Sequence, residues 1–265
     1  MKTINVAVMG AAGKMGREIC KAVINEPGLN LVAAFDVMFP CHDIGSLIGM
    51  APNGVVIERK YNKKANRKID VVIDFTNAQA LLNNIDKFID DGINVVIGTT
   101  GLTDTEISAI GEKAKNSNVG VFMAPNFAIG AVLMMKFAIE AAKYLPHVEI
   151  IELHHDQKLD APSGTAIKTL NEISKVRKAF HQGADQEYEK IPGARGGDYE
   201  GMRIHSVRLP GLVAHQEVLF GGLGQTLSIR HDSISRESFM AGIMLAVKKV
   251  SNWQGLVYGL ENILE

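Results

Sequence analysis

Short apolar runs separated by amphipathic segments dominate the first half of the chain. Helical patterns follow the first run up to residue 25 and recur later between the runs, at residues 78–91 and 104–117. The apolar runs have the length of buried strands, and they fall at residues 4–9, 29–35, 71–73, 95–97 and 119–122. Strands that alternate with helices predict a doubly wound parallel sheet with helices on both faces.

The pattern changes in the second half. Residues 128–143 are apolar on nearly every side, which predicts a buried helix, and residues 183–201 are rich in glycine and proline, which predicts a long loop. A strand is expected at 148–153, a helix at 165–180, and then three strand-like runs at 202–209, 213–220 and 225–231. Strands in succession predict a mixed or antiparallel sheet, and hence a second α+β domain.

A helix at 236–250 and a tail at 256–264 close the chain. We therefore predict one domain from residues 1–126 and 235–265, and a second from residues 127–234. Two domains that enclose a ligand are expected to close on it. The hinges are expected where the chain crosses, near Asn126–Gly130 and near Ser233–Arg236.

A glycine-rich turn follows the first strand. Its residues are Gly10, Ala11, Ala12, Gly13, Lys14, Met15 and Gly16, with the spacing G-x-x-G-x-x-G rather than G-x-G-x-x-G. Small residues between a strand and a helix let the backbone approach a pyrophosphate at the positive helix N-terminus. Asp36 ends the second strand about 20 residues later, where it can bind a ribose 2′-hydroxyl. We predict a Rossmann-like dinucleotide-binding domain; the alternative is a glycine turn built for tight packing.

The residue after Asp36 bears on the choice of cofactor. It is Val37, not the arginine or lysine that would offset repulsion between the Asp36 carboxylate and a 2′-phosphate. Lys14 and Arg17 are the nearby cations that can reach such a phosphate. We therefore expect either a preference for NADH or the use of both NADH and NADPH.

The segment from Glu152 to Ala166 gathers groups suited to acid–base chemistry. His154 and His155 can move protons near neutral pH, and Lys158 is a point cation for a carboxylate. Ser163, Gly164 and Thr165 can open a helix and present backbone N–H groups to an anion. These parts predict a site that binds an acid and transfers protons beside it.

Composition narrows the class of protein. The 265 residues are 46% hydrophobic and 22% charged with a net charge of −1, which is ordinary for a globular protein and gives no footprint for nucleic acid. No apolar run has the length of a membrane span, and no signal peptide is expected before the first strand. Cys20 and Cys41 are the two cysteines, as expected for a reduced cytoplasmic protein. Cys41-His42-Asp43 lacks a partner cluster, so no metal site is predicted.

These segments together resemble the 4-hydroxy-tetrahydrodipicolinate (dihydrodipicolinate) reductase family of lysine and diaminopimelate biosynthesis. The resemblance spans almost the whole chain, and the string E-x-H-H-x-x-K-x-D-x-P-S-G-T-A is its most specific part. The matching residues are Gly10–Gly16, Phe75-Thr76, Gly98-Thr99-Thr100-Gly101, Ala124-Pro125-Asn126-Phe127 and Glu152–Ala166.

The resemblance implies roles for individual residues. His154 corresponds to the proton donor and acceptor, and Lys158 to a second proton donor. Four residues correspond to the substrate-binding groups, with Ser163 contributing its backbone N–H: His155, Ser163, Gly164 and Thr165. The implied cofactor contacts are Gly10–Met15, Asp36, Gly98, Thr99, Thr100, Ala124, Pro125, Asn126 and Phe127, to which we add Gly16 and the neighbouring Phe75 and Thr76.

The implied reaction reduces a cyclic imine that carries two carboxylates, with NADH or NADPH as the hydride donor and a protein acid as the proton donor. The implied assembly is a homotetramer, with the second domain's sheet at the interface. Two alternatives stay open: an amino-acid dehydrogenase such as an aspartate dehydrogenase, and a non-catalytic sensor of the NADH/NAD ratio. The sequence also leaves open where water is lost from the 4-hydroxy substrate, and any feedback by lysine.

Several further residues have two readings. Asp160 and Pro162 are expected to shape the turn rather than to react. Arg195 either clamps the substrate or is a surface arginine. Arg236 either contacts the substrate, acts at a hinge, or forms an ion pair at the start of a helix or between the domains. We expect structural roles for three other histidines: His205, His215 and His231.

Overall fold

The computed structural model describes residues 3–63 and 68–264. The first two residues, which bear on the expectation about a signal peptide, lie outside this part. The chain forms two compact units, one from Met1–Phe127 with Arg236–Glu265 and one from Ala128–Ser235. Over the described residues, none of the helices combines the length and the apolar character that crossing a lipid bilayer requires.

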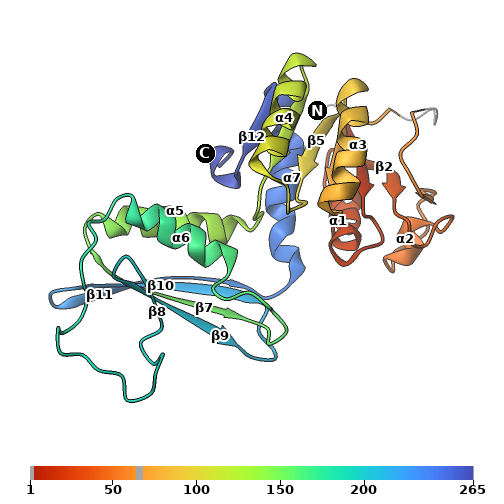
Figure 1. Ribbon diagram of the computed structural model, residues 1–265. Coiled ribbons are helices and arrows are strands. Elements are labelled where there is room, and N and C mark those ends of the chain that lie inside the picture. Colours follow the sequence, from red (N-terminus) through yellow and green to blue (C-terminus); the bar gives the residue numbers. More distant parts are fainter. Residues whose placement is uncertain (1–2, 64–67, 265) are drawn as a thin grey trace. The chain divides into compact units, whose positions relative to one another are not determined.

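A seven-stranded sheet forms the centre of the first unit (Figure 1). Its strand order is β12-β6-β5-β4-β1-β2-β3, and every neighbouring pair is parallel. The strands are β1 (Ile4–Met9), β2 (Leu29–Phe35), β3 (Ile57–Glu58), β4 (Val71–Asp74), β5 (Asn94–Ile97), β6 (Gly120–Met123) and β12 (Gly255–Tyr258). Since all the strands are parallel, their carboxyl ends lie along one edge of the sheet.

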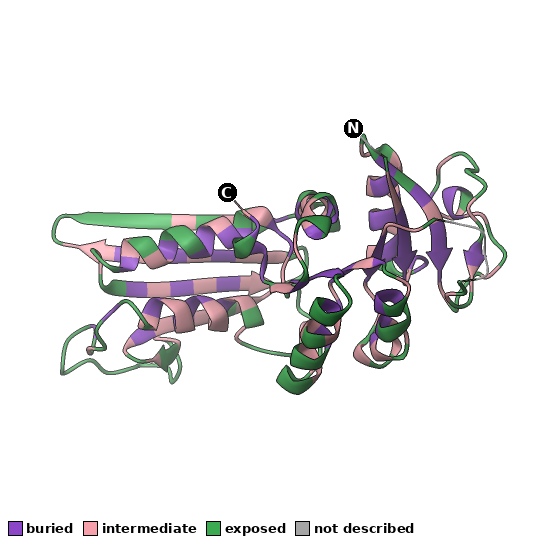
Figure 2. Cartoon of the chain, turned by 90° about the horizontal axis from the view of Figure 1, so that it is seen from above, coloured by how far each residue is buried: buried purple, intermediate pink, exposed green. Residues whose placement is uncertain are grey.

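The strands of this sheet are largely buried (Figure 2). Four longer helices accompany them, and a short one follows β2: α1 (Lys14–Asn25), α2 (Ile44–Leu47), α3 (Ala78–Asp90), α4 (Asp104–Asn116) and α7 (Met240–Lys249). Phe88 of α3 and Phe122 of β6 are fully buried. Such near-continuous apolar strands are typical of a parallel sheet that is covered on both faces.

Local sequence explains where these helices begin. The Asn77 side chain accepts a hydrogen bond from the Ala80 N–H and caps α3. Thr103 and Glu106 form a reciprocal capping box at α4. The N-cap residue of α1 is Gly13, which has no side chain to accept a hydrogen bond from the first turn. This helix therefore opens on bare backbone, unlike α3 and α4.

The second unit is a five-stranded mixed sheet of order β11-β10-β7-β9-β8, in which β7 and β9 are parallel and the other pairs antiparallel. Its strands are β7 (His147–His154), β8 (Gly197–Tyr199), β9 (Met202–Arg208), β10 (Ala214–Gly222) and β11 (Gln225–Ser233). Helices α5 (Ile129–Ala142) and α6 (Gly164–Ser174) lie against one face of this sheet (Figure 1). Alternate residues of β7 are buried beneath them, namely Val148, Ile150 and Glu152.

The predicted fold class is confirmed, with a Rossmann-like parallel sheet in one unit and a mixed sheet in the other. Several boundaries were wrong. No element was expected between the runs at 29–35 and 71–73, yet α2 forms there and is capped by the Asp43 side chain, and the loop expected at 183–201 contains β8. The tail forms β12, which pairs with β6 at the edge of the first sheet.

Helix α6 also ends earlier than expected, at Ser174 rather than near residue 180. The guanidinium of Arg177 accounts for this, because it donates to the carbonyl oxygens of Pro146 and Glu200 and lies over the ring of Phe180. These contacts draw the chain away from the helix axis. Residues Arg236–Phe239, expected as part of the last helix, form a 3-10 turn before α7.

Gly16 of α1 offers a test of the packing at the carboxyl edge of β1. A Cβ at this position would lie 1.9 Å from the Gly10 carbonyl oxygen. We expect Gly16→Ala to lower the free energy of unfolding by about 1–3 kcal/mol through overpacking, despite the better helix propensity of alanine. Denaturant titration followed by circular dichroism measures this.

Gly111→Ala in α4 is the matched control, since its added Cβ would meet the Leu256 Cβ at 3.2 Å. A helical propensity gain of about 1 kcal/mol opposes that milder contact, so little net change is expected. A Gly16→Ala protein as stable as its parent would contradict the account of this turn.

Candidate active site

The glycine turn lies at the carboxyl end of β1 and is held to the neighbouring strand β2. The N–H groups of Gly10 and Ala11 both donate to the Phe35 carbonyl oxygen, at 2.9 and 3.1 Å. Gly10 has φ +75°, and a Cβ there would lie 2.9 Å from the Phe75 carbonyl oxygen. Glycine is therefore required by both backbone conformation and space. The uncapped start of α1 follows directly, as a pyrophosphate site needs.

Asp36 follows β2 and lies beside this turn. Its Oδ2 accepts from the Ala12 N–H at 2.9 Å and its Oδ1 accepts from the Met38 N–H at 2.8 Å. The structure thus brings the predicted ribose-binding carboxylate and the predicted pyrophosphate turn into direct contact. Carboxylate oxygens have further lone pairs for a ribose hydroxyl.

Arg17 was one of two cations considered for a 2′-phosphate, and it lies in the same cluster. Its Nε donates to the Ala12 carbonyl oxygen at 2.8 Å, and its guanidinium lies 5.5 Å from the centre of the Phe39 ring. Lys14, the other cation, is exposed on the first turn of α1. Arg17 and Asp36 are thus both hydrogen-bonded to Ala12. The guanidinium places positive charge near Asp36, which the following residue, Val37, does not provide.

The loops after β4 and β5 are joined by a buried carboxyl group. Asp74, the last residue of β4, has no exposed surface. Its Oδ1 accepts from the Thr76 hydroxyl at 2.7 Å and from the Thr99 hydroxyl at 2.8 Å. Burial raises the pKa of Asp74, and the hydrogen bonds from Thr76 and Thr99 oppose this rise. The sequence analysis did not single out Asp74, although an acid directly after three apolar strand residues is a visible signal.

Aromatic rings complete this edge of the sheet. A Cβ on Gly98 would lie 2.1 Å from the ring of Phe75, so the glycine lets the ring pack on the backbone. The rings of Phe75 and Phe127 have centroids 5.5 Å apart. Ala124 is buried, whereas Thr100 and Pro125 are exposed and Asn126 is half-buried. All the predicted cofactor-binding residues therefore belong to one unit, at the carboxyl ends of β1, β2, β4, β5 and β6.

The residues present fit a dinucleotide. A backbone cradle that a Cβ would fill, an uncapped helix start and an acid beside it are the features that such a cofactor needs. Among residues 3–63 and 68–264, no group of three or more histidine, cysteine, aspartate or glutamate side chains is placed to hold a metal ion. Asp43, in the Cys41-His42-Asp43 segment, instead caps α2.

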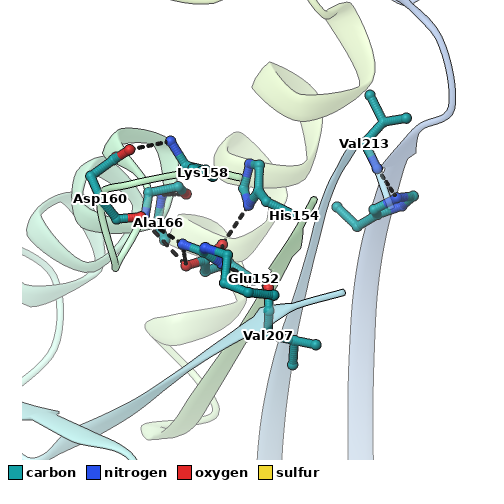
Figure 3. Close-up of polar contacts among 10 residues, drawn as sticks. Glu152, His154, Lys158, Asp160, Ala166, Val207 and Val213 are labelled. Atoms are coloured by element: carbon teal, nitrogen blue, oxygen red, sulfur yellow. Dashed lines mark hydrogen bonds and ion pairs between the residues drawn. The ribbon is translucent and has the colours of Figure 1, made fainter. Parts of the chain in front are cut away.

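A separate cluster of predicted site residues belongs to the other unit, at the end of β7 (Figure 3). The His154 Nδ1 lies 2.5 Å from a carboxylate oxygen of Glu152, two residues earlier on the same face of the strand. The Glu152 side chain has no exposed surface and the His154 side chain is 14% exposed. Lys158 lies in the loop after β7, where its Nζ donates to Asp160 at 2.6 Å.

Arg208, the last residue of β9, is a partner that the sequence analysis missed. It donates to both carboxylate oxygens of Glu152, with Nη1 at 3.0 Å and Nη2 at 2.7 Å. Its Nη2 also donates to the Asp160 carbonyl oxygen at 2.8 Å. The signal lay in the alternation of β9, because Met202 and Ile204 are buried and Arg208 continues their side of the strand.

These contacts set the charges of the cluster. Burial by itself raises the pKa of Glu152, but hydrogen bonds from Arg208, Ser206 and His154 outweigh it and lower that pKa below its ordinary value. Burial lowers the pKa of His154, Glu152 opposes this, and the positive charges of Lys158 and Arg208 add to the lowering. The pKa of Asp160 is lowered chiefly by its hydrogen bond from Lys158. The cluster thus holds an ionised carboxylate beside an imidazole that readily gives up its proton.

The predicted anion site lies at the start of α6. The Ser163 hydroxyl accepts from the Ala166 N–H at 3.3 Å, so Ser163 is the N-cap. Its own N–H donates to Glu152 at 3.3 Å, which differs from the expectation that this N–H faces a substrate carboxylate. Gly164 is exposed, with nothing within 4 Å of an added Cβ, and Thr165 is half-buried. His155, on the strand-end side of the loop, is exposed.

Arg195 is not free to clamp a substrate in this structure. Its guanidinium pairs with Glu149 at 2.9 Å and with Glu187 at 2.5 Å. Side chains along a strand point alternately to the two faces of the sheet, so Glu149 faces away from Glu152 and His154. Arg195, Glu149 and Glu187 therefore form a cluster on the sheet face opposite to His154. Arg236 is exposed at the first position of the 3-10 turn.

The three histidines that were expected to be structural have partners within the second unit. His205 pairs with Glu149 at 2.9 Å, and His215 pairs with Asp232 at 2.6 Å. The ring of His231 packs on Gly130, where an added Cβ would lie 2.5 Å from it.

Known proteins resemble this chain over the lengths of both units. The chain is 56% identical to the 4-hydroxy-tetrahydrodipicolinate reductase of Desulfitobacterium hafniense, over the full length of both proteins. It is 53% identical to the enzyme of the same name from Halalkalibacterium halodurans, covering 99% of this chain and all of that protein. Dihydrodipicolinate reductase from Paenisporosarcina sp. TG-14, solved with dipicolinate bound, is similar with a TM-score of 0.86 and 47% identity, covering 99% and 100% of the two chains.

Two family models cover nearly all of the chain. The one described as dihydrodipicolinate reductase, N-terminus, matches residues 4–127, and the one described as dihydrodipicolinate reductase, C-terminus, matches residues 130–264. With a complete dinucleotide turn in one unit and the His154–Lys158 segment in the other, the chain belongs to the dihydrodipicolinate reductase family.

Proposed function

We propose that this protein catalyses the NAD(P)H-dependent reduction of 4-hydroxy-tetrahydrodipicolinate (dihydrodipicolinate) to tetrahydrodipicolinate, in lysine and diaminopimelate biosynthesis. The observation that carries the proposal is the full-length similarity to reductases of this name, together with an intact proton-transfer segment at the end of β7. In this reading, residues 1–126 and 235–265 bind the dinucleotide, and residues 127–234 bind substrate and form the assembly.

The dinucleotide is bound by the carboxyl edge of the parallel sheet. Backbone N–H groups at the start of α1 take the pyrophosphate, and Asp36 takes the adenine ribose. The loops after β4, β5 and β6 hold the nicotinamide end, which supplies a hydride when the cofactor is bound. The hydrogen bonds of Thr76 and Thr99 to Asp74 fix two of these loops relative to one another.

The substrate is a cyclic imine dicarboxylate, and cationic and N–H groups suit its carboxylates. Gly164 and Thr165 at the N-terminus of α6 bind one carboxylate, and His155 contacts the ring. Ser163 contributes by capping this helix, since its N–H is directed to Glu152.

Addition of hydride to the conjugated ring leaves an electron pair on the ring that must take up a proton. His154 supplies that proton, and Lys158 is the second donor. Lys158 reaches the substrate by exchanging its ion pair with Asp160, a contact at the surface of the loop.

We propose a homotetramer in the cytoplasm. The sheet face opposite to α5 and α6 carries half-buried apolar side chains between its charged pairs, and these are Ile151, Leu153, Val207 and Leu219. Such a mixed face suits an interface between copies of the chain. Cys20 and Cys41 are both free, as a reduced compartment requires.

Reductase activity is tested by the loss of NADH or NADPH absorbance with substrate generated in place by the preceding synthase from pyruvate and aspartate semialdehyde. We expect turnover in the parent, and a loss of about 10²–10⁴-fold in kcat in His154→Ala and in Lys158→Ala, since each removes a proton donor. Binding of NADH, followed by fluorescence, should survive in both.

His181→Ala and Lys178→Ala are the matched controls, because both side chains are exposed in the segment after α6. Tight cofactor binding by the parent without turnover would contradict the reductase and favour a nucleotide sensor. Ammonia-dependent turnover of oxaloacetate would favour an aspartate dehydrogenase.

Cofactor choice is tested at Asp36. We expect the parent to use NADH at least as well as NADPH, because the Asp36 carboxylate repels a 2′-phosphate. Asp36→Asn removes this charge, so the ratio of kcat/KM for NADH to that for NADPH should fall about tenfold, the equivalent of about 1.4 kcal/mol. Asp43→Asn, which alters an acid at the start of α2, should leave the ratio unchanged. A parent with a strong NADPH preference would contradict this assignment.

Assembly is tested by sedimentation velocity. The parent should sediment as four chains, and Leu219→Glu should dissociate it, because a carboxylate would be buried in the interface. Leu223→Glu is the matched control, since Leu223 is fully exposed at the turn between β10 and β11. A parent that sediments as a single chain would overturn the proposal.

A further inference from the structure

We propose that Glu152 is a positioning residue for the proton transfer, which holds the Nδ1–H of His154 so that Nε2 is the nitrogen that exchanges a proton with the substrate, and that Arg208 keeps Glu152 ionised for this task. The inference rests on the proposed function, and it adds two residues to it. Neither residue contacts the substrate in this assignment; both act through His154.

The side chain of Glu152 has no exposed surface. A carboxylate without exposed surface is stable only when it is paired and hydrogen-bonded. Glu152 accepts two bonds from Arg208, at 2.7 and 3.0 Å, and one from the Ser163 N–H at 3.3 Å. The two-pronged guanidinium bond is the strongest kind of pairing available to a carboxylate. These bonds keep its pKa below the ordinary value although burial alone would raise it.

The charge of Glu152 determines which nitrogen of His154 carries the proton. An ionised carboxylate only accepts hydrogen bonds. The 2.5 Å contact between Glu152 and the His154 Nδ1 therefore requires the proton to be on Nδ1. In the neutral ring, Nε2 then carries the lone pair, and in the charged ring Nε2 carries the proton that can be given away.

The register of the sheet brings the residues of this cluster to one face. In the parallel pair of β7 and β9, Glu152 lies opposite Ser206, and His154 lies opposite Arg208. All four side chains therefore share the face covered by the helices. On β10, Gln216 lies opposite Glu152 and is buried as well. The face is apolar through Val148 and Ile150 and becomes polar only at the strand ends, which places the cluster at one edge of the sheet.

Arg208 also ties this cluster to the loop that carries Lys158. Its Nη2 donates to the Asp160 carbonyl oxygen at 2.8 Å, and the Asp160 side chain pairs with Lys158 at 2.6 Å. One guanidinium thus positions both proposed proton donors. The charged groups that act on His154 are Glu152 on its own strand, Arg208 on β9 and Lys158 in the loop before α6.

The proton step balances with these groups alone. After hydride addition, the Nε2–H bond of the His154 imidazolium breaks and its electron pair stays on the ring. The proton forms a new bond to the ring atom of the substrate that carries the electron pair. His154 is left neutral with Nδ1–H facing Glu152, and it regains a proton from solvent through Nε2.

The pH dependence follows with a definite sign. The donor must be protonated, so kcat falls as pH rises through the pKa of His154. The Glu152 carboxylate raises that pKa against the effects of burial, Lys158 and Arg208. Removing its charge should lower the pKa further and move the falling limb of the pH profile to lower pH. An opposite charge within hydrogen-bond reach shifts a pKa by about 1–3 units, so a displacement of at least about one pH unit is expected.

The test measures kcat of Glu152→Gln, Glu152→Asp and the parent from about pH 5 to about pH 10. This range spans the ordinary histidine pKa of about 6.5. Glu152→Gln should lower kcat at pH 8 by about a hundredfold, move the falling limb downward, and change KM for NADH by less than about twofold. Glu152→Asp keeps the charge. Its kcat should lie between those of Glu152→Gln and the parent, and its kcat should fall at nearly the same pH as that of the parent.

Glu149→Gln is the matched control. Glu149 is on the same strand and is also paired with an arginine and a histidine, but on the opposite face of the sheet. Its limb should coincide with that of the parent, with sedimentation verifying assembly. The proposal would be overturned if the falling limb of the kcat profile stayed in place in Glu152→Gln, because a purely structural role lowers kcat without moving this limb. It would also be overturned if the limb moved equally in Glu149→Gln.

Two further arms keep the outcomes separate. If Glu152→Gln does not fold, because Arg208 is left without its carboxylate partner, the double variant Glu152→Gln/Arg208→Met removes both charges. Because Arg208 lowers the pKa of His154 less than Glu152 raises it, the falling limb of the double variant should still move to lower pH, by a smaller displacement. If the parent itself lacks turnover, the proposed function fails, and the titration of the His154 ring protons by NMR in the same variants decides the positioning role. A lower His154 pKa in Glu152→Gln supports it, and an unchanged pKa overturns it.

Discussion

The buried carboxylate of Glu152 is the constraint around which the second unit is organised. A charge without access to water must be met from within the protein, and three parts of the chain provide its partners. Arg208 comes from β9 and the Ser163 N–H from the start of α6. His154 comes from the same strand as Glu152 (Figure 3). The pairing therefore fixes the end of a sheet, the beginning of a helix and the orientation of the imidazole at once.

In the first unit, the parallel arrangement of the strands brings the proposed cofactor-binding loops together. Its seven strands are all parallel, so every loop at the carboxyl edge meets its neighbours. The glycine turn and Asp36 are joined by the Ala12 N–H, and the loops after β4 and β5 by Asp74. The proposed cofactor site is consequently made of backbone and short polar side chains, which leaves the acid–base groups to the other unit.

The sequence was most informative where local rules decide. Period-two and helical patterns placed most elements within a few residues, and the strand–turn–helix context identified the turn at Gly10–Gly16. One element that depends on a distant partner was missed, since strand β12 forms because the tail pairs with β6. Helix α2 was also missed, although Asp43, which caps it, directly precedes it in the sequence. A helix of four residues is too short to show the repeating apolar pattern by which longer helices are predicted.

The same distinction holds for the proposed site. His154 and Lys158 belong to one dense segment and were assigned from it, but Arg208 is 56 positions from Glu152 and is joined to it only by the register of β7 and β9. For Arg195, the sequence left two roles open, a substrate clamp and a surface arginine. The alternation of β7 places its partner Glu149 on the sheet face opposite to His154, which the position of Arg195 in a loop does not reveal.

The central claim is that an ionised, buried carboxylate fixes which nitrogen of His154 carries the proton. Nitrogen-15 NMR of the histidine-labelled protein measures this directly, with the His154 signals identified by their loss in His154→Gln. Above the pKa of His154, the account predicts a protonated Nδ1 and an unprotonated Nε2. A neutral ring with its proton on Nε2 would contradict it, because Glu152 would then have to carry a proton of its own to make the 2.5 Å contact.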